Sequence, residues 1–254
     1  MRANDKICIP PRLAAPCRVS RVNQATLPRH AAMNPTLDIA QARFNMIEQQ
    51  IRPWDVLDQD VLDLLDVVRR EEFVPPAHRL HAFMDIEIPL DAAGPGAAMW
   101  SPKMEARVLQ EVQAKSHDRA LEIGAGSGYF AALLAHRCHS VTTVEIVPAL
   151  KALAERNLKA ARITNARVQQ GDGANGFGSE RYDIIVLSGS TPVVSPKLLA
   201  QLNPGGRLFA VSGDAPAMIA CVYTQAASGV VAQELFETVL TPLMNAPQPA
   251  RFVF

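Results

Sequence analysis

Short apolar or β-branched segments alternate with helical segments through the second half of the chain. The strand-like segments are 120–123, 141–147, 166–169, 182–187 and 207–211, and the helical ones are 129–136, 148–161 and 196–202. Alternation at this spacing is typical of a parallel sheet with helices on both faces. Two more strand-like runs, 218–225 and 230–243, are joined at a glycine and predict an antiparallel C-terminal hairpin. The sequence therefore predicts an α/β fold with a Rossmann-like, doubly wound and mostly parallel sheet.

The first half of the chain is predicted to be mainly helical. Apolar residues recur at helical spacing over 37–50, and Pro53 ends that helix. A second helix is expected to start at Asp58 as its N-cap, and a third covers 103–115. Between them, 83–102 is expected to be an extended loop interrupted by Gly and Pro. We therefore expect an N-terminal helical cap over 33–115 and the α/β domain over 116–254.

Residues 1–32 differ from the rest of the chain in composition. They carry many basic residues against a single acid, Asp5, and show no apolar period. We expect a disordered extension, or a start codon assigned too early with Met33 as the true first residue. The arginine excess leaves an organelle transit peptide open, whereas the continuous apolar run of a secretory signal is missing. A chain that starts at Met33 is expected to be as stable as the full one.

Charge and cysteine content exclude several classes of protein. Lys+Arg and Asp+Glu both total 25, which argues against a domain built to hold nucleic acid. No apolar run is long enough to span a membrane. The cysteines Cys8, Cys17, Cys138 and Cys221 form no C-x-x-C pair, so we expect free thiols and no metal site. A cytoplasmic location without nucleic-acid or membrane partners follows, and the oligomeric state stays open.

Three closely spaced glycines follow the strand that begins at Ala120. A phosphate-binding P-loop would need a lysine after Gly128, and a dinucleotide fingerprint would need a small residue where Tyr129 stands. The spacing Glu122-x-Gly124-x-Gly126-x-Gly128 is instead typical of S-adenosylmethionine methyltransferases. Glycines let the backbone pass close to the methionine and ribose of that cofactor, and Glu122 suits its cationic amino group. A glycine-rich turn without a ligand is the alternative.

Two more acids follow the next two strands. Glu145 ends the strand in "VTTVE", where a carboxylate can accept both ribose hydroxyls. Asp172 lies in "QQGDGANG", where it can accept from the adenine amino group while Gly171 and Gly173 let the base approach. Ligands of open α/β sheets bind at the strand ends. We therefore predict a class I S-adenosylmethionine methyltransferase fold with S-adenosylmethionine as cofactor.

Several stretches resemble the protein-L-isoaspartate (D-aspartate) O-methyltransferases. "VVRREEFVPPAHRLHAFMDIEIPL" is similar to the family's Arg-x-x-Phe-Val-Pro segment and the Leu-Pro after it. "ALEIGAGSGYFAALLA", "GDG", "YDIIVLSGSTP", "LLAQLNPGGRLFAVSG" and the final "RFVF" also resemble family motifs. The resemblance implies that S-adenosylmethionine methylates the carboxylate of L-isoaspartyl residues in damaged proteins or peptides, the first step of their repair.

One loop departs from the family pattern Gly-x-Gly-x-x-Ile-Ser-x-Pro, whose serine lies at the active site. The aligned stretch is "GPGAAMWSP", in which Gly94, Gly96 and Pro102 match. The serine position holds Trp100, and Ser101 follows one place later. Trp100 is either a core aromatic or a wall over the acceptor, and Ser101 takes the place of the hydroxyl only if the loop slips by one residue. Ser101 and Trp100 are therefore the candidate catalytic residues.

The expected reaction needs no general base from the chain. A carboxylate with a pKa near 4 is ionised at neutral pH and is already the nucleophile, so catalysis requires positioning and the exclusion of water. Two other hypotheses remain. The protein could methylate a different acceptor, although "SGSTP" lacks the Asn/Asp-Pro-Pro-aromatic motif of base amino-methylases. It could also be a non-catalytic module that binds the cofactor.

Overall fold

The computed structural model describes residues 35–90 and 96–249. The basic stretch 1–32, Gly94 and the final "RFVF" lie outside the described residues. The predictions made for them therefore stay predictions.

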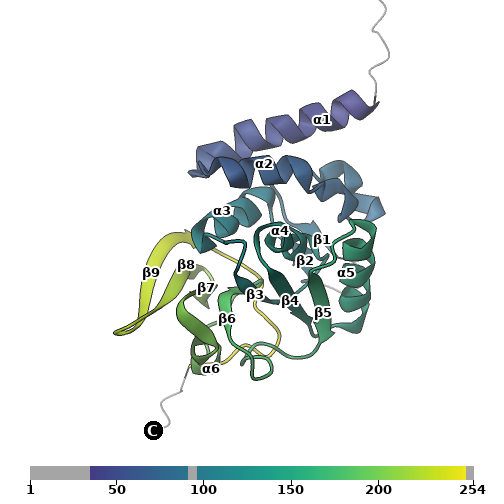
Figure 1. The fold of residues 1–254 in the computed structure, drawn as a ribbon. Coiled ribbons are helices and arrows are strands. Elements are labelled where there is room, and N and C mark those ends of the chain that lie inside the picture. The colour runs from purple at the N-terminus through teal and green to yellow at the C-terminus, as the bar shows by residue number, and fades with distance from the viewer. Residues whose placement is uncertain (1–34, 91–95, 250–254) are drawn as a thin grey trace, which may run out of the picture.

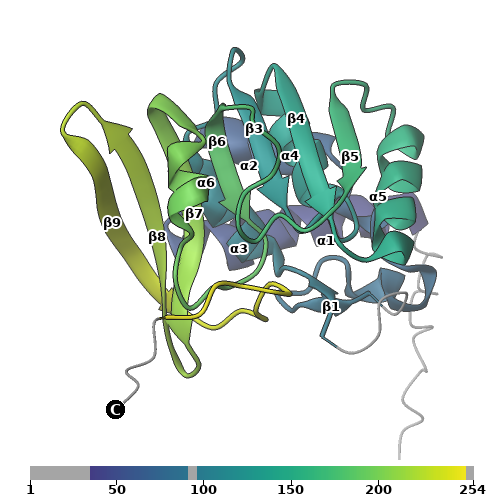
Figure 2. The same ribbon diagram turned by 90° about the horizontal axis from the view of Figure 1, so that it is seen from below.

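A seven-stranded sheet forms the centre of the molecule (Figures 1 and 2), and its order is β5-β4-β3-β6-β7-β8-β9. Its strands are β3 Arg119–Ile123, β4 Ser140–Glu145, β5 Ala166–Gln170, β6 Tyr182–Leu187, β7 Leu202–Asp214, β8 Ala217–Ala226 and β9 Gly229–Thr238. The pairings from β5 through to β7 are parallel, and β8 and β9 are antiparallel. Both the parallel sheet and the C-terminal hairpin predicted from the sequence are confirmed.

The helices that join the parallel strands are α4 Tyr129–Arg137, α5 Pro148–Ala160 and α6 Pro196–Ala200. The first half of the chain forms α1 Pro35–Met46, a π-helix Ile47–Ile51, α2 Gln59–Val67 and α3 Pro102–Val112. Short 3-10 turns cover Arg52–Trp54, Arg70–Glu72 and Pro76–His81. The predicted N-cap of α2 is confirmed, because the Asp58 carboxylate accepts from the backbone N–H groups of Asp60 and Val61.

Two of the sequence-based expectations were wrong in detail. The segment 83–102 contains two paired strands, β1 Ile88–Pro89 and β2 Ala98–Met99, rather than only a loop. Strands this short carry no alternation that a sequence can reveal. The helix expected over 196–202 ends at Ala200, because Leu202 already pairs with Tyr182 at the start of β7.

Alternating side chains on the strands create two apolar cores. On β6, Ile184 and Val186 face one side, which is filled by side chains of α2, α3, α4 and α5. Ile185 and Leu187 face the other side, where Leu198 of α6 packs. The first core continues without a break from Met46 in the N-terminal part to residues of β8. The domain division at residue 115 therefore stays a prediction.

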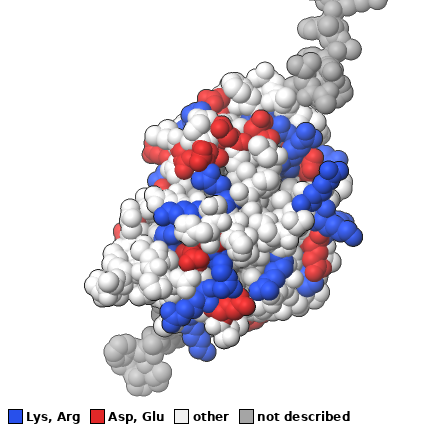
Figure 3. Space-filling view, in the orientation of Figure 1, with Lys and Arg blue, Asp and Glu red and all other residues white. Residues whose placement is uncertain are grey.

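Within residues 35–90 and 96–249, no helix is long and apolar enough to cross a membrane. Blue and red side chains are interspersed on the described part of the face in Figure 3, where no area of a single sign extends across the surface. This face therefore lacks the continuous basic surface that is typical of a nucleic-acid-binding domain.

Candidate functional site

A cavity of about 410 Å³ opens at the carboxyl ends of the parallel strands. Ile123 and Gly124 line it at the end of β3, Glu145 at the end of β4, Asp172 after β5 and Ser188 after β6. From β3 the chain continues outward on one side to β4 and β5, and on the other side to β6 and β7. Ligands of open α/β sheets bind at such a switch point, which here lies between β3 and β6. The volume lies in the range of pockets that hold cofactors and small molecules.

The glycine loop after β3 forms one wall of this cavity. Gly124 and Gly126 line it with positive φ angles of 100° and 52°, which side-chain-bearing residues rarely adopt. Gly128 has a different place, outside the lining of the cavity. A Cβ at Gly128 would lie 3.2 Å from backbone atoms of Ala154, so this glycine allows the start of α4 to pack closely on α5.

Glu145 is buried, with 4% of its surface exposed, and connects two segments of the cavity wall. Its Oε2 accepts a hydrogen bond from the Gly126 N–H at 3.0 Å, and its Oε1 accepts from the Val147 N–H at 3.0 Å. Each carboxylate oxygen has a second lone pair that can accept from a ligand hydroxyl.

Asp172 lies at the exposed rim of the cavity. Its Oδ1 accepts from the Ala174 N–H at 3.0 Å, and its Oδ2 accepts from Asn245 Nδ2 at 2.9 Å. Gly173, next to it, lines the cavity and is buried. A Cβ at Gly173 would stand 2.5 Å from Ile123 Cδ1, so only glycine fits there without a shift of the Ile123 side chain.

Glu122 does not reach the large cavity. It is 1% exposed and lines a small neighbouring cavity of about 40 Å³. Its two oxygens accept hydrogen bonds from the hydroxyls of Thr143, at 2.7 Å, and Ser188, at 3.0 Å. Burial raises the pKa of Glu122 to about 8 against the opposing effect of both hydroxyls. The predicted contact of Glu122 with a cofactor amino group therefore stays a prediction.

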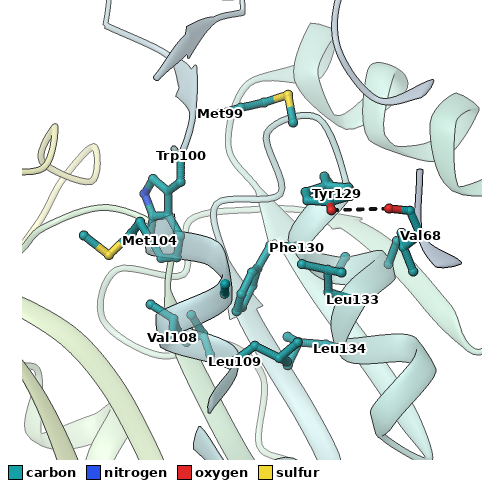
Figure 4. Close-up of a cluster of buried hydrophobic side chains, with 14 of the residues drawn as sticks. Val68, Met99, Trp100, Met104, Val108, Leu109, Tyr129, Phe130, Leu133 and Leu134 are labelled. Carbon is teal, nitrogen blue, oxygen red and sulfur yellow. Dashed lines mark hydrogen bonds between the residues drawn. The ribbon is translucent and has the colours of Figure 1, made fainter. Parts of the chain in front are cut away.

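The two candidate catalytic residues have different surroundings. Trp100 is buried and lines both cavities, and its indole packs against Phe130 at a ring-centroid distance of 5.6 Å (Figure 4). It also packs against Phe209 at 6.3 Å. Ser101 lines neither cavity and is the N-cap of α3. The structure thus brings Trp100, and not Ser101, to the wall of the cavity. The one-residue slip relative to the family pattern stays a prediction.

Residues 241–244 also line the cavity, and the sequence reasoning did not single them out. After β9 the chain returns across the carboxyl edge of the sheet. Ser190 donates its N–H to the Thr241 carbonyl at 3.0 Å and accepts from the Leu243 N–H at 2.8 Å. Asn245 then reaches Asp172. No local sequence pattern indicates that residues 241–244 line the cavity, because this depends on where the end of β9 lies relative to β6.

The described lining of the large cavity has acids but no His, Lys or Arg. Glu87, Glu145 and Asp172 are its titratable side chains. No group of His, Cys, Asp and Glu suited to a metal ion occurs among the described residues. The site therefore offers hydrogen-bond acceptors and close backbone approach.

Residues 41–247 match the family described as protein-L-isoaspartate (D-aspartate) O-methyltransferase. The chain belongs to this family. A protein-L-isoaspartate O-methyltransferase of Methanoculleus marisnigri is 38% identical over 172 residues, which cover 67% of this chain and 77% of that protein. One of Herpetosiphon aurantiacus is 37% identical over 176 residues, or 69% of this chain and 77% of that protein.

Solved structures of the protein-L-isoaspartate O-methyltransferase family share the fold. One aligns with a TM-score of 0.68 at 23% identity and covers 79% of this chain and 65% of its own. A Plasmodium falciparum structure, described as a complex with S-adenosyl-L-homocysteine, aligns with a TM-score of 0.67 at 18% identity. It covers 80% of this chain and 97% of its own. At these identities the likeness establishes the class I methyltransferase architecture.

Proposed function

We propose that this chain transfers a methyl group from S-adenosylmethionine to the carboxylate of L-isoaspartyl residues in proteins and peptides. One observation carries the proposal. In a member of the isoaspartate methyltransferase family, one cavity at the strand ends is lined by Gly124, Gly126, Glu145 and Asp172.

The residues present fit the cofactor. At Gly124, Gly126 and Gly173 the cavity is lined by backbone without side chains, so a nucleoside can approach it closely. We infer that Glu145 accepts from the ribose hydroxyls and that Asp172 accepts from the adenine amino group. Gly124, Gly126 and Gly173 would allow close approach, and Glu122 and Gly128 would support the loop from behind.

S-adenosylmethionine supplies an activated methyl group when it is bound. The chain has to hold the acceptor carboxylate in line and keep water away. Such a carboxylate is ionised at neutral pH, which agrees with a described cavity lining that contains no histidine or lysine. Glu145 is held by two backbone N–H groups, so its role is to accept hydrogen bonds.

The acceptor assignment is tested by incubating the protein with labelled S-adenosylmethionine and a peptide that contains one L-isoaspartyl residue. The same peptide with normal aspartate is the control. Turnover of the isoaspartyl peptide alone supports the proposal. Methylation of another acceptor, which the Trp100 wall favours as a second candidate function, would contradict the isoaspartyl assignment. Binding of the cofactor without any turnover would identify a non-catalytic module.

We also propose that the protein works in the cytoplasm. Cys138 and Cys221 are free and buried, which agrees with a reducing compartment. Fractionation of cells that express the full chain tests this, and recovery from an organelle or an extracellular fraction would contradict it.

A further inference from the structure

Arg70 carries a buried charge for which the proposed reaction has no role. Its side chain is 1% exposed and lies in the 3-10 turn that precedes Phe73. The residue lines neither of the two cavities, so it does not touch a ligand held there. A charge so deep in a protein normally has a specific partner, because removing it from water is costly.

The guanidinium of Arg70 has two partners in neighbouring segments. Its Nη2 donates to the backbone carbonyl of Trp100 at 2.6 Å, and its Nη1 donates to Glu105 Oε2 at 3.2 Å. It also lies over the ring of Tyr129, 5.5 Å from the centroid. Arg70 thus joins three elements around the site, namely its own turn, the start of α3 and the start of α4.

The carbonyl that Arg70 holds belongs to a residue that lines both cavities. Trp100 lines the large cavity and the small one, and its indole lies among apolar side chains in Figure 4. A charge-assisted hydrogen bond made by a buried group is strong and directional. The position of the Trp100 backbone, and with it the depth of the indole in the cavity wall, therefore depends on Arg70.

The buried contacts of Arg70 are not the most stabilising arrangement that this position allows. Arg70 Nε is buried and has no hydrogen-bond partner among the described residues. Buried ion pairs can often be replaced by apolar residues without loss of stability. A third donor without a partner adds to the cost of this pair. A structural role of the Arg70–Glu105 pair does not explain why the guanidinium also holds the Trp100 carbonyl.

We propose that Arg70 is a positioning residue for acceptor binding. By holding the Trp100 carbonyl, it sets how far the indole extends over the space beside the glycine loop, and so how much room the methyl acceptor has. The inference rests on the proposed function, because it takes the large cavity to be the place where cofactor and acceptor meet.

The first test compares two variants that break different contacts of the guanidinium. Arg70→Lys keeps the charge beside Glu105 but loses the planar fork that holds two acceptors at once. Glu105→Gln removes the ion pair and leaves the bond to the Trp100 carbonyl in place. The KM for the isoaspartyl peptide is expected to rise about tenfold in Arg70→Lys and to change by less than about threefold in Glu105→Gln. The affinity for S-adenosyl-L-homocysteine, measured by calorimetry, should stay within about twofold in both variants.

The second test follows the indole directly. The chain contains two tryptophans, so a Trp54→Phe background leaves Trp100 as the fluorescent one. Arg70→Lys should shift its emission to longer wavelength, and Glu105→Gln should not. In a Trp100→Phe background, Arg70→Lys should no longer raise KM, because its effect passes through the indole.

The double variant Arg70→Met with Glu105→Leu removes both buried charges together and serves if Arg70→Lys does not fold. It also loses the bond to the Trp100 carbonyl, so the same rise in KM and the same emission shift are expected. Equal effects of Arg70→Lys and Glu105→Gln, or an unshifted emission in every Arg70 variant, would overturn the proposal. A parent protein that turns over no isoaspartyl peptide would contradict the proposed function instead, and the emission would still report on Arg70.

Discussion

The Glu145 carboxylate accepts a hydrogen bond from the backbone N–H of Gly126 at 3.0 Å and so joins the end of β4 to the glycine loop after β3. Two neighbouring strands thereby present their ends to one cavity in a fixed relation. A ligand that bridges them meets a surface that is already formed, which reduces the entropy cost of binding.

Replacing Glu145 with alanine removes the acceptor for two backbone donors and for any ligand hydroxyl. We expect Glu145→Ala to weaken S-adenosyl-L-homocysteine binding by about 1–3 kcal/mol, since each unpaired polar group carries a penalty. Calorimetry measures the effect. Glu145→Gln keeps one acceptor oxygen and should lose less. Wild-type affinity in Glu145→Ala would mean that the adenosine binds elsewhere.

Asp172 is expected to contribute separately to affinity. Asp172→Ala should also weaken S-adenosyl-L-homocysteine binding by about 1–3 kcal/mol. The matched control is Asn245→Ala, which removes the link between Asp172 and the C-terminal segment but keeps the carboxylate. A much smaller loss in Asn245→Ala indicates a direct contact between Asp172 and the ligand. Equal losses would mean that Asp172 acts only through that link.

The third glycine of the loop is expected to matter for stability rather than for binding. Gly128 has a φ of 82°, and an added Cβ would meet the Ala154 backbone at 3.2 Å. Gly128→Ala should lower the free energy of unfolding by about 1–3 kcal/mol through strain, as followed by urea denaturation. Binding of S-adenosyl-L-homocysteine below the unfolding transition should change by less than about twofold. A large loss of affinity in a fully folded variant would contradict this.

Substitutions at Trp100 and at Ser101 are expected to affect isoaspartyl turnover differently. Ser101 lines neither cavity and its side chain makes no capping hydrogen bond, so Ser101→Ala should keep isoaspartyl turnover within about twofold of the parent and leave stability nearly unchanged. Trp100→Ser removes a bulky wall and should change kcat/KM for the isoaspartyl peptide, with an increase if the indole blocks the acceptor. Steady-state assays on the same peptide measure both. Loss of activity in Ser101→Ala would support the one-residue slip that brings Ser101 to the acceptor. No change in either variant would mean that the acceptor binds elsewhere.

Glu122 predicts a pH dependence of stability. Burial raises its pKa from 4.5 to about 8, so between these values the folded state binds more protons than the unfolded state. Stability should therefore fall as pH rises through this window, at most about 1.4 kcal/mol per pH unit for one group. Thermal midpoints of Glu122→Gln should decline less than those of the parent between about pH 5 and pH 8.5. Part of the decline remains, because burial also raises the pKa of Glu105, against the opposing attraction of the Arg70 guanidinium. Identical pH profiles would contradict the assignment.

The fold was predictable because each parallel strand has a local sequence pattern that indicates a strand. Buried strands such as 182–187 are short apolar runs, and the structure places that strand over the same residues. The same holds for the N-cap at Asp58, where one side chain decides the local conformation. The pairing of Ile88 with Met99 could not be predicted, because two-residue strands depend on what lies around them.

The candidate site was predictable in part. Glu145 and Asp172 line the cavity as expected from acids that end successive strands. Glu122 is hidden behind the loop, since its place in the middle of a pleated, central strand points its side chain at the neighbours Thr143 and Ser188. The roles of Arg70 and Leu243 depend on segments far apart in the chain, and no local pattern indicates such contacts.

The return of residues 241–244 across the strand ends has a consequence for the newly made protein. The ribosome produces β3 to β6 well before this segment, so the nascent chain holds the glycine loop and its acids while one side of the cavity is still missing. Residues 241–244 complete the enclosure only after β9 has been added. The lining of the cavity is therefore completed late in synthesis, and a chain that ends just after β9 lacks this part of the wall.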